Sequence, residues 1–149
     1  MTSCILRSWL VAWAVAVFLP SALIAGFGLA PGNAAVGLSA LPGATWAVAD
    51  EMGPAAKLLL GGLLLAAFLL VERRQLRKPG GRAVLAMAGA VVAMLATIAL
   101  LPEAWSRGFA SGLSGQRFDP ALLAAYLPGA LFAGIVFAGS VSRCLRSKI

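Results

Sequence analysis

The sequence contains no histidine and only five acidic residues among 149. The missing histidine excludes histidine-ligated haem, histidine-bound zinc or copper, and a histidine general base. Charged residues make up 11% of the chain, whereas soluble domains carry about 25%, so a soluble domain is excluded as well. We find no catalytic residue set, no metal-ligand spacing and no cofactor motif. The sequence therefore predicts a protein that is not an enzyme.

Long apolar segments make up most of the chain instead. They are Ser8–Ala30, Pro54–Val71, Ala83–Leu101 and Pro120–Ser142, and the mean hydropathy is +0.94. At a rise of 1.5 Å per residue, each can cross a hydrocarbon layer of about 30 Å. Lipid offers backbone groups no other partner, so the segments are predicted to be helices. The sequence predicts an all-α integral membrane protein: one domain over 1–149, with four transmembrane helices in an antiparallel bundle.

Basic residues gather on one side of this arrangement. Nine of the twelve Lys and Arg residues precede the first segment, lie in 72–82 or follow the fourth segment. The positive-inside rule then predicts a bacterial-type inner-membrane protein with both termini and the basic segment 72–82 in the cytoplasm. The net charge of +7 is explained by this topology and by attraction to anionic lipid, and no nucleic-acid partner is expected.

Two features near the termini have a second interpretation. Arg7 followed by an apolar run also describes a signal peptide, but cleavage after Ala30 would leave Pro31 at the first mature position, so we predict an uncleaved first helix. Cys4 and Cys144 both fall on the predicted cytoplasmic side. Thiols stay reduced there, and we predict two separate, inert cysteines.

The outer connections, 31–53 and 102–119, are too apolar for floating linkers. We predict that they lie along the outer membrane interface with Trp46 and Trp105 at headgroup level, and that they form a partner or ligand surface. Trp9 and Trp13 share one face of the first helix near the cytoplasmic boundary. They are interpreted as an interfacial anchor, with a docking stripe for a larger membrane subunit as the alternative.

Small residues recur at every fourth position on two of the predicted helices. One ladder lies on the fourth helix and one on the third: Ala130, Gly134, Ala138 and Ser142; Gly89, Ala93 and Thr97. Small residues let helix backbones approach closely in lipid. A tight contact between the third and fourth helices is therefore predicted, with a face kept free for another protein as the alternative.

Polar and kinked positions within the spans are few. Pro20 and Pro128 lie inside predicted helices, and with Ser21 and Tyr126 they could form a small outward-facing pocket on a transport pathway. The alternative is that neighbouring helices simply tolerate the two prolines. Lys57, the deepest ionisable group, is interpreted as a lysine that reaches the interface and faces Asp50 or Glu51. No Asp or Glu lies in a predicted span, which removes the usual carrier group of a proton-coupled transporter.

A short resemblance concerns the entry to the second helix. Leu41-Pro42-Gly43, Met52-Gly53-Pro54 and the run Leu58–Val71 resemble the small four-helix membrane subunit of tripartite tricarboxylate transporters, where similar elements precede the second helix. The chain departs from that family at Ala55–Leu58, where the family has Gly-Phe-Phe-Pro. The resemblance implies a component of an uptake system.

Size and residue inventory favour a non-enzymatic accessory or structural subunit of a larger membrane complex. The expected partners are membrane lipids, with anionic lipid at the basic segment, and either other membrane subunits or further copies of the chain. A small transporter or channel with a pathway near the prolines is the competing interpretation. A lipid-modifying enzyme, with Lys57, Arg117 and Tyr126 as its only polar candidates, comes third.

Overall fold

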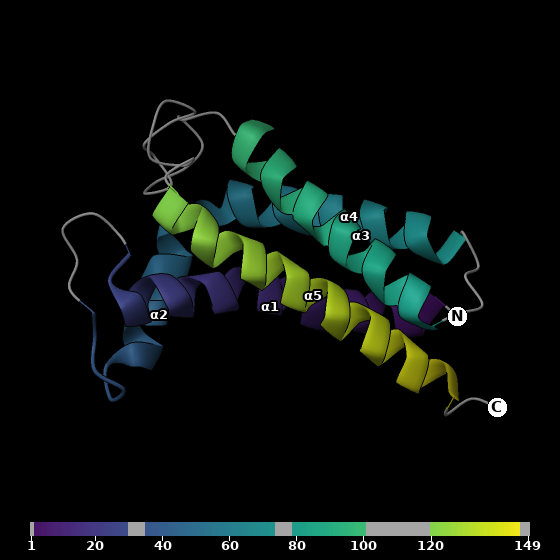
Figure 1. Cartoon of the computed structure of the whole chain (residues 1–149), viewed down its shortest axis with the longest axis horizontal. Helices are drawn as coiled ribbons and strands as arrows, with labels where there is room; N and C mark the ends of the chain where they lie inside the picture. The colour runs from purple at the N-terminus through teal and green to yellow at the C-terminus, as the bar shows by residue number, and fades with distance from the viewer. Residues whose placement is uncertain (1, 30–34, 74–78, 101–119, 147–149) are drawn as a thin grey trace.

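The computed structural model describes residues 2–29, 35–73, 79–100 and 120–146. Within these ranges the chain forms five helices: α1 (Thr2–Phe27), α2 (Leu41–Glu51), α3 (Gly53–Arg73), α4 (Pro79–Leu100) and α5 (Pro120–Arg146) (Figure 1). All but α2 are long and apolar enough to cross a membrane. The prediction of an all-α protein with four membrane-length helices is confirmed, and it indicates a multi-pass membrane protein.

The helices extend beyond the apolar segments at their basic ends. α1 begins at Thr2 rather than at Ser8, and α5 continues to Arg146. Hydropathy marks the apolar part of a helix, whereas the hydrogen-bonded backbone continues into its polar ends. Pro79 is the first residue of α4, where its missing N–H is not needed.

At its other end, α1 stops in a left-handed glycine turn. Gly28 has φ 62°, and the N–H of Leu29 donates a hydrogen bond of 3.0 Å to the carbonyl of Ile24. This is the 6→1 bond of a Schellman motif, which satisfies a carbonyl that the helix leaves open. The first helix therefore ends three residues before the predicted boundary at Ala30.

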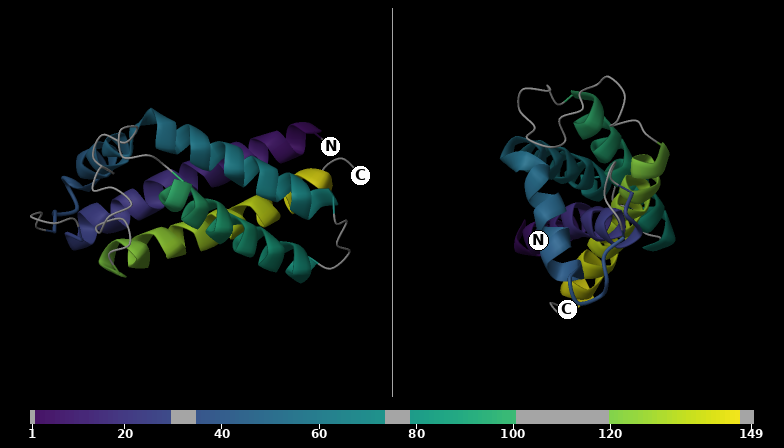
Figure 2. Two further views of the ribbon diagram at one scale, coloured as in Figure 1. Left: turned by 90° about the horizontal axis from the view of Figure 1, so that it is seen from above. Right: turned by 90° about the vertical axis from the view of Figure 1, so that its left-hand side faces the viewer.

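The long helices pack lengthwise against one another. α5 lies against both α1 and α4, α3 lies against α4 and, over a smaller area, against α1, and α2 packs on α1 (Figure 2). The two termini lie at the same end of the molecule as the facing ends of α3 and α4, and α2 lies at the opposite end (Figure 1). The helix ends next to the basic segments of the sequence therefore lie together at one end of the molecule.

The interior is centred on a pair of aromatic rings. Phe68 of α3 and Phe137 of α5 are fully buried, and their rings stack with centroids 3.9 Å apart. Further large, fully buried apolar side chains come from α3, α4 and α5, among them Leu60, Leu64, Met94, Ile98 and Val141. On the outer surface Leu70 and Val92 are 62% and 65% exposed, as expected of side chains that face lipid.

Candidate functional site

The ladder on α5 contacts α4 as predicted. A Cβ added to Gly134 would lie 2.5 Å from the Cα of Met87 and 2.7 Å from the carbonyl carbon of Ala86. Only a residue without a side chain lets the two backbones approach so closely. The α4 side of the prediction is wrong in one respect: Gly89 faces Ala67 of α3, where an added Cβ would lie 3.2 Å away.

Trp9 and Trp13 point at α3. Their rings stack in parallel with centroids 5.5 Å apart. The indole N–H of Trp9 donates to the carbonyl of Gly61, and that of Trp13 to the carbonyl of Lys57, both at 2.9 Å. Both indole N–H groups are therefore used within the protein, in a contact between α1 and α3 that the sequence interpretation did not include.

Gly61 makes that contact possible. A Cβ at Gly61 would stand 3.0 Å from the Trp13 ring, whereas one at the adjacent Gly62 would meet nothing within 4 Å. Of the two adjacent glycines at the centre of α3, Gly61 thus lies against the Trp13 indole, whereas Gly62 has free space beside it. The sequence does not single out Gly61, because two adjacent glycines look alike without knowledge of which face α1 covers.

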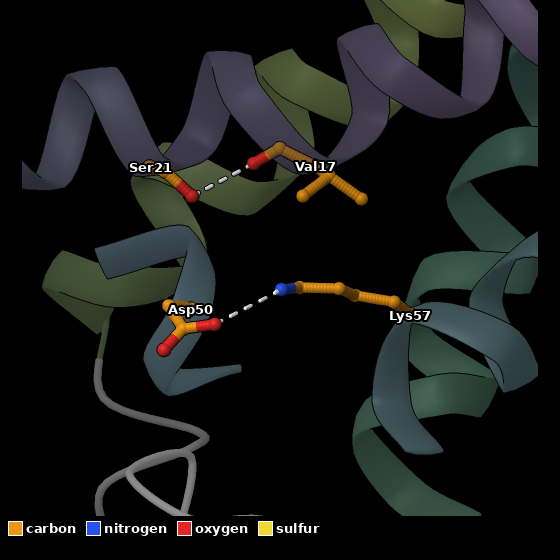
Figure 3. Close-up of polar contacts among 4 residues, drawn as sticks. All are labelled: Val17, Ser21, Asp50 and Lys57. Atoms are coloured by element: carbon orange, nitrogen blue, oxygen red, sulfur yellow. Dashed lines mark hydrogen bonds and ion pairs between the residues drawn. The ribbon is translucent and has the colours of Figure 1, made fainter. Parts of the chain in front are cut away.

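Of the residues of the proposed pathway, Pro20 packs closely on α5. Pro20 is fully buried, and a Cβ on Gly129 would lie 2.3 Å from its Cγ. The buried hydroxyl of Ser21 donates to the carbonyl of Val17 in its own helix at 2.8 Å (Figure 3). Tyr126 is 6% exposed, and Pro128 precedes the glycine at the contact. Pro20 therefore lies at a close contact between α1 and α5, and no space remains between Pro20 and Gly129 for a solute.

Gly129 is a residue that the sequence interpretation missed. Ala125, Gly129 and Ala133 form a second ladder of small residues on α5, and all three are buried. Their four-residue spacing is the signal that could have identified the face of α5 that packs on α1.

We expect the Pro20 contact to behave as packing in a double-mutant cycle. Gly129→Ala should lower the free energy of unfolding by about 2 kcal/mol, because the new methyl overlaps the proline ring. In a Pro20→Ala background the same change should cost less than about 0.5 kcal/mol, because the ring is gone. Unfolding in mixed micelles, followed by circular dichroism, measures both values.

Gly139→Ala is the matched control, since a Cβ there meets nothing within 4 Å. This substitution should leave stability unchanged or raise it slightly, as alanine is the better helix former. An equal cost of Gly129→Ala with and without Pro20 would show that the two residues do not contact each other.

A sharp corner joins α2 to α3. Gly53 has φ 75°, a left-handed conformation that favours glycine. Across this corner Lys57 Nζ lies 3.9 Å from Asp50 Oδ1 (Figure 3). The predicted orientation of Lys57 toward an outer acidic residue is confirmed. Since the Asp50 side chain is 75% exposed, the pair is a weak surface contact that helps to orient α2.

Part of the outer connection 31–53 is helical, because α2 occupies Leu41–Glu51. The ring of Trp46 stacks on that of Phe18 in α1 with centroids 5.8 Å apart, yet Trp46 remains 67% exposed. Trp105 and the segment 102–119 lie outside the described residues. Of the two tryptophans on the predicted outer surface, the structure therefore describes Trp46, whose side chain is largely exposed.

The two cysteines are joined. Cys4 near the start of α1 and Cys144 near the end of α5 form a disulfide, with Cα atoms 5.8 Å apart. The prediction of two separate reduced thiols is wrong, because packing of α1 on α5 brings residues 140 positions apart within disulfide reach. Closing so long a loop restricts the unfolded chain and favours the folded state.

Comparisons of this chain with models of known families, with curated proteins and with solved structures find no match. The resemblance to a tricarboxylate transporter subunit therefore depends only on Leu41–Gly43, Met52–Pro54 and the run Leu58–Val71.

Proposed function

We propose that this protein is a non-enzymatic accessory or structural subunit of a larger membrane complex, and that it binds its partner through α2. The observation that carries the proposal is Trp46, a large aromatic side chain held against Phe18 but left 67% exposed. Buried tryptophans dominate the binding energy of many protein interfaces. A rigidly held, exposed indole is therefore a fitting contact for a partner.

The use of polar groups within the long helices also supports a structural role. Hydroxyl groups of Ser21, Thr97 and Ser142 each donate to the carbonyl four residues earlier. The indoles of Trp9 and Trp13 are bound to α3 carbonyls. Side chains engaged in this way stabilise helices and their contacts, and they are not arranged around a substrate.

In the proposed arrangement, α1, α3, α4 and α5 cross a bacterial-type inner membrane as an antiparallel bundle with both termini in the cytoplasm. The support is the charge distribution, since Arg7, Arg73 and Arg143 all belong to the end that carries the termini. This orientation places the disulfide at the reducing side. Cys4 is 1% exposed and Cys144 is partly exposed, so burial limits the access of soluble thiols to the sulfur of Cys4 but not to that of Cys144.

Co-purification tests the role of α2. After extraction in mild detergent, the tagged protein should purify together with a stoichiometric membrane partner. Trp46→Ala should reduce recovery of that partner at least tenfold, which corresponds to the loss of about 1.4 kcal/mol or more expected of an aromatic contact residue. Mass spectrometry of the eluate measures the ratio of the two chains.

Phe27→Ala is the matched control, because Phe27 is an aromatic residue at the same end of the molecule and is 71% exposed. It should leave the partner bound. Elution of the unmodified protein as a single chain, or equal loss of partner from both variants, would contradict the proposal.

A further inference from the structure

An apolar groove runs along the outside of the α3–α4 pair. Its volume is about 680 Å³. Its lining combines leucines, among them Leu63 and Leu70 of α3 and Leu85 of α4, with alanines such as Ala66 and Ala88. Ala66 and Ala88 are exposed, so the groove opens to whatever surrounds the helices.

The groove covers only half of the membrane. On α4 its lining residues run from Leu85 to Ala96, which corresponds to about 16 Å at 1.5 Å per residue. The full hydrocarbon layer is about 30 Å thick, so the groove is about half as long as the layer is thick. A lipid acyl chain, which reaches to about the middle of the layer, has a similar length.

Arginine side chains lie near one end of the groove, the end closest to the connection between α3 and α4. Arg73 is exposed two residues beyond the lining residue Val71, and Arg82 precedes Leu85 by one turn. The Nε of Arg82 lies 3.2 Å from Oε1 of Glu72, so these two charges largely offset each other. The net positive charge of Arg73 then lies where the headgroup of a lipid in that leaflet would be.

We infer that this groove binds an anionic phospholipid, with one acyl chain between α3 and α4 and the phosphate beside Arg73. The alanines of the lining admit a chain close to the helix backbones, and the leucines of the lining contact the chain. The arginine supplies the headgroup with an attraction that a zwitterionic lipid lacks. This inference does not depend on the partner proposed for α2.

Lipid titration in detergent, followed by native mass spectrometry, tests the site. Phosphatidylglycerol and phosphatidylcholine with identical acyl chains serve as probes. The unmodified protein should bind phosphatidylglycerol about fivefold more tightly, the preference expected from one basic residue near a membrane surface. Arg73→Gln should remove that preference, while binding of phosphatidylcholine should stay unchanged.

A groove-filling variant tests the acyl-chain contact. Ala66→Leu with Ala88→Leu should lower the affinity for phosphatidylglycerol by about fivefold or more, because the added side chains occupy the groove. Ala14→Leu, which enlarges an exposed alanine on α1, should have no effect. Equal affinity of the unmodified protein for both lipids, or undiminished binding to the filled groove, would overturn the inference. Loss of a dimer in the filled variant with unchanged lipid binding would assign the groove to a second copy of the chain and overturn it as well.

Discussion

Gly134→Leu is expected to lower the free energy of unfolding by about 3 kcal/mol or more. The added side chain would begin 2.5 Å from the Cα of Met87, and a backbone atom cannot rotate out of the way as a flexible side chain can. α4 and α5 must therefore separate, which also disturbs the stacked pair Phe68 and Phe137 at the centre of the protein. Unfolding in mixed micelles, monitored by circular dichroism, measures the loss.

Gly139→Leu is the matched control on the same helix. Nothing lies within 4 Å of an added Cβ at Gly139, so leucine there extends into the surroundings and should change stability by less than about 0.5 kcal/mol. The comparison separates the cost of crowding from the helix propensity of leucine, since both variants replace glycine within α5. Similar stabilities of the two variants would mean that the close approach at Gly134 does not hold the helices together.

The second prediction with a large expected effect concerns thiol labelling of two single-cysteine variants, of which only one should react in intact spheroplasts. Single cysteines at Gly43 in α2 and Gly80 in α4, in a background with Cys4→Ser and Cys144→Ser, report on the two ends of the molecule. An added Cβ meets nothing within 4 Å at either position, so neither change should disturb packing. We expect an impermeant thiol reagent to label Gly43→Cys in intact spheroplasts and Gly80→Cys only after lysis, because the basic end faces the cytoplasm.

Labelling of both variants after lysis is the control for reactivity. The opposite pattern in spheroplasts would reverse the orientation, and it would place the disulfide of Cys4 and Cys144 on the oxidising side of the membrane. The preference for anionic lipid at the α3–α4 groove would remain, but in the other leaflet.

The sequence by itself determined the number and approximate limits of the membrane-length helices. Apolar runs such as Ala83–Leu101 identify these helices because a lipid-crossing backbone must satisfy its own hydrogen bonds. Spacing along one helix was also informative. The four-residue ladder at Gly134 identified a close contact. Lys57, as the deepest ionisable group, was predicted to face Asp50 or Glu51, and it pairs with Asp50. These inferences are local, since they need only helix geometry and the chemistry of nearby residues.

Only the tertiary structure decided which faces meet. In lipid an apolar side chain is equally suited to the surroundings and to the interior, so hydropathy does not show how each helix is rotated. Trp9 and Trp13 therefore turned out to bind α3 carbonyls, Gly89 to face α3, and Pro20 to pack on Gly129. The Cys4–Cys144 disulfide has the same origin: helix rotation and pairing bring together residues from opposite ends of the chain, and no spacing in the sequence records that contact.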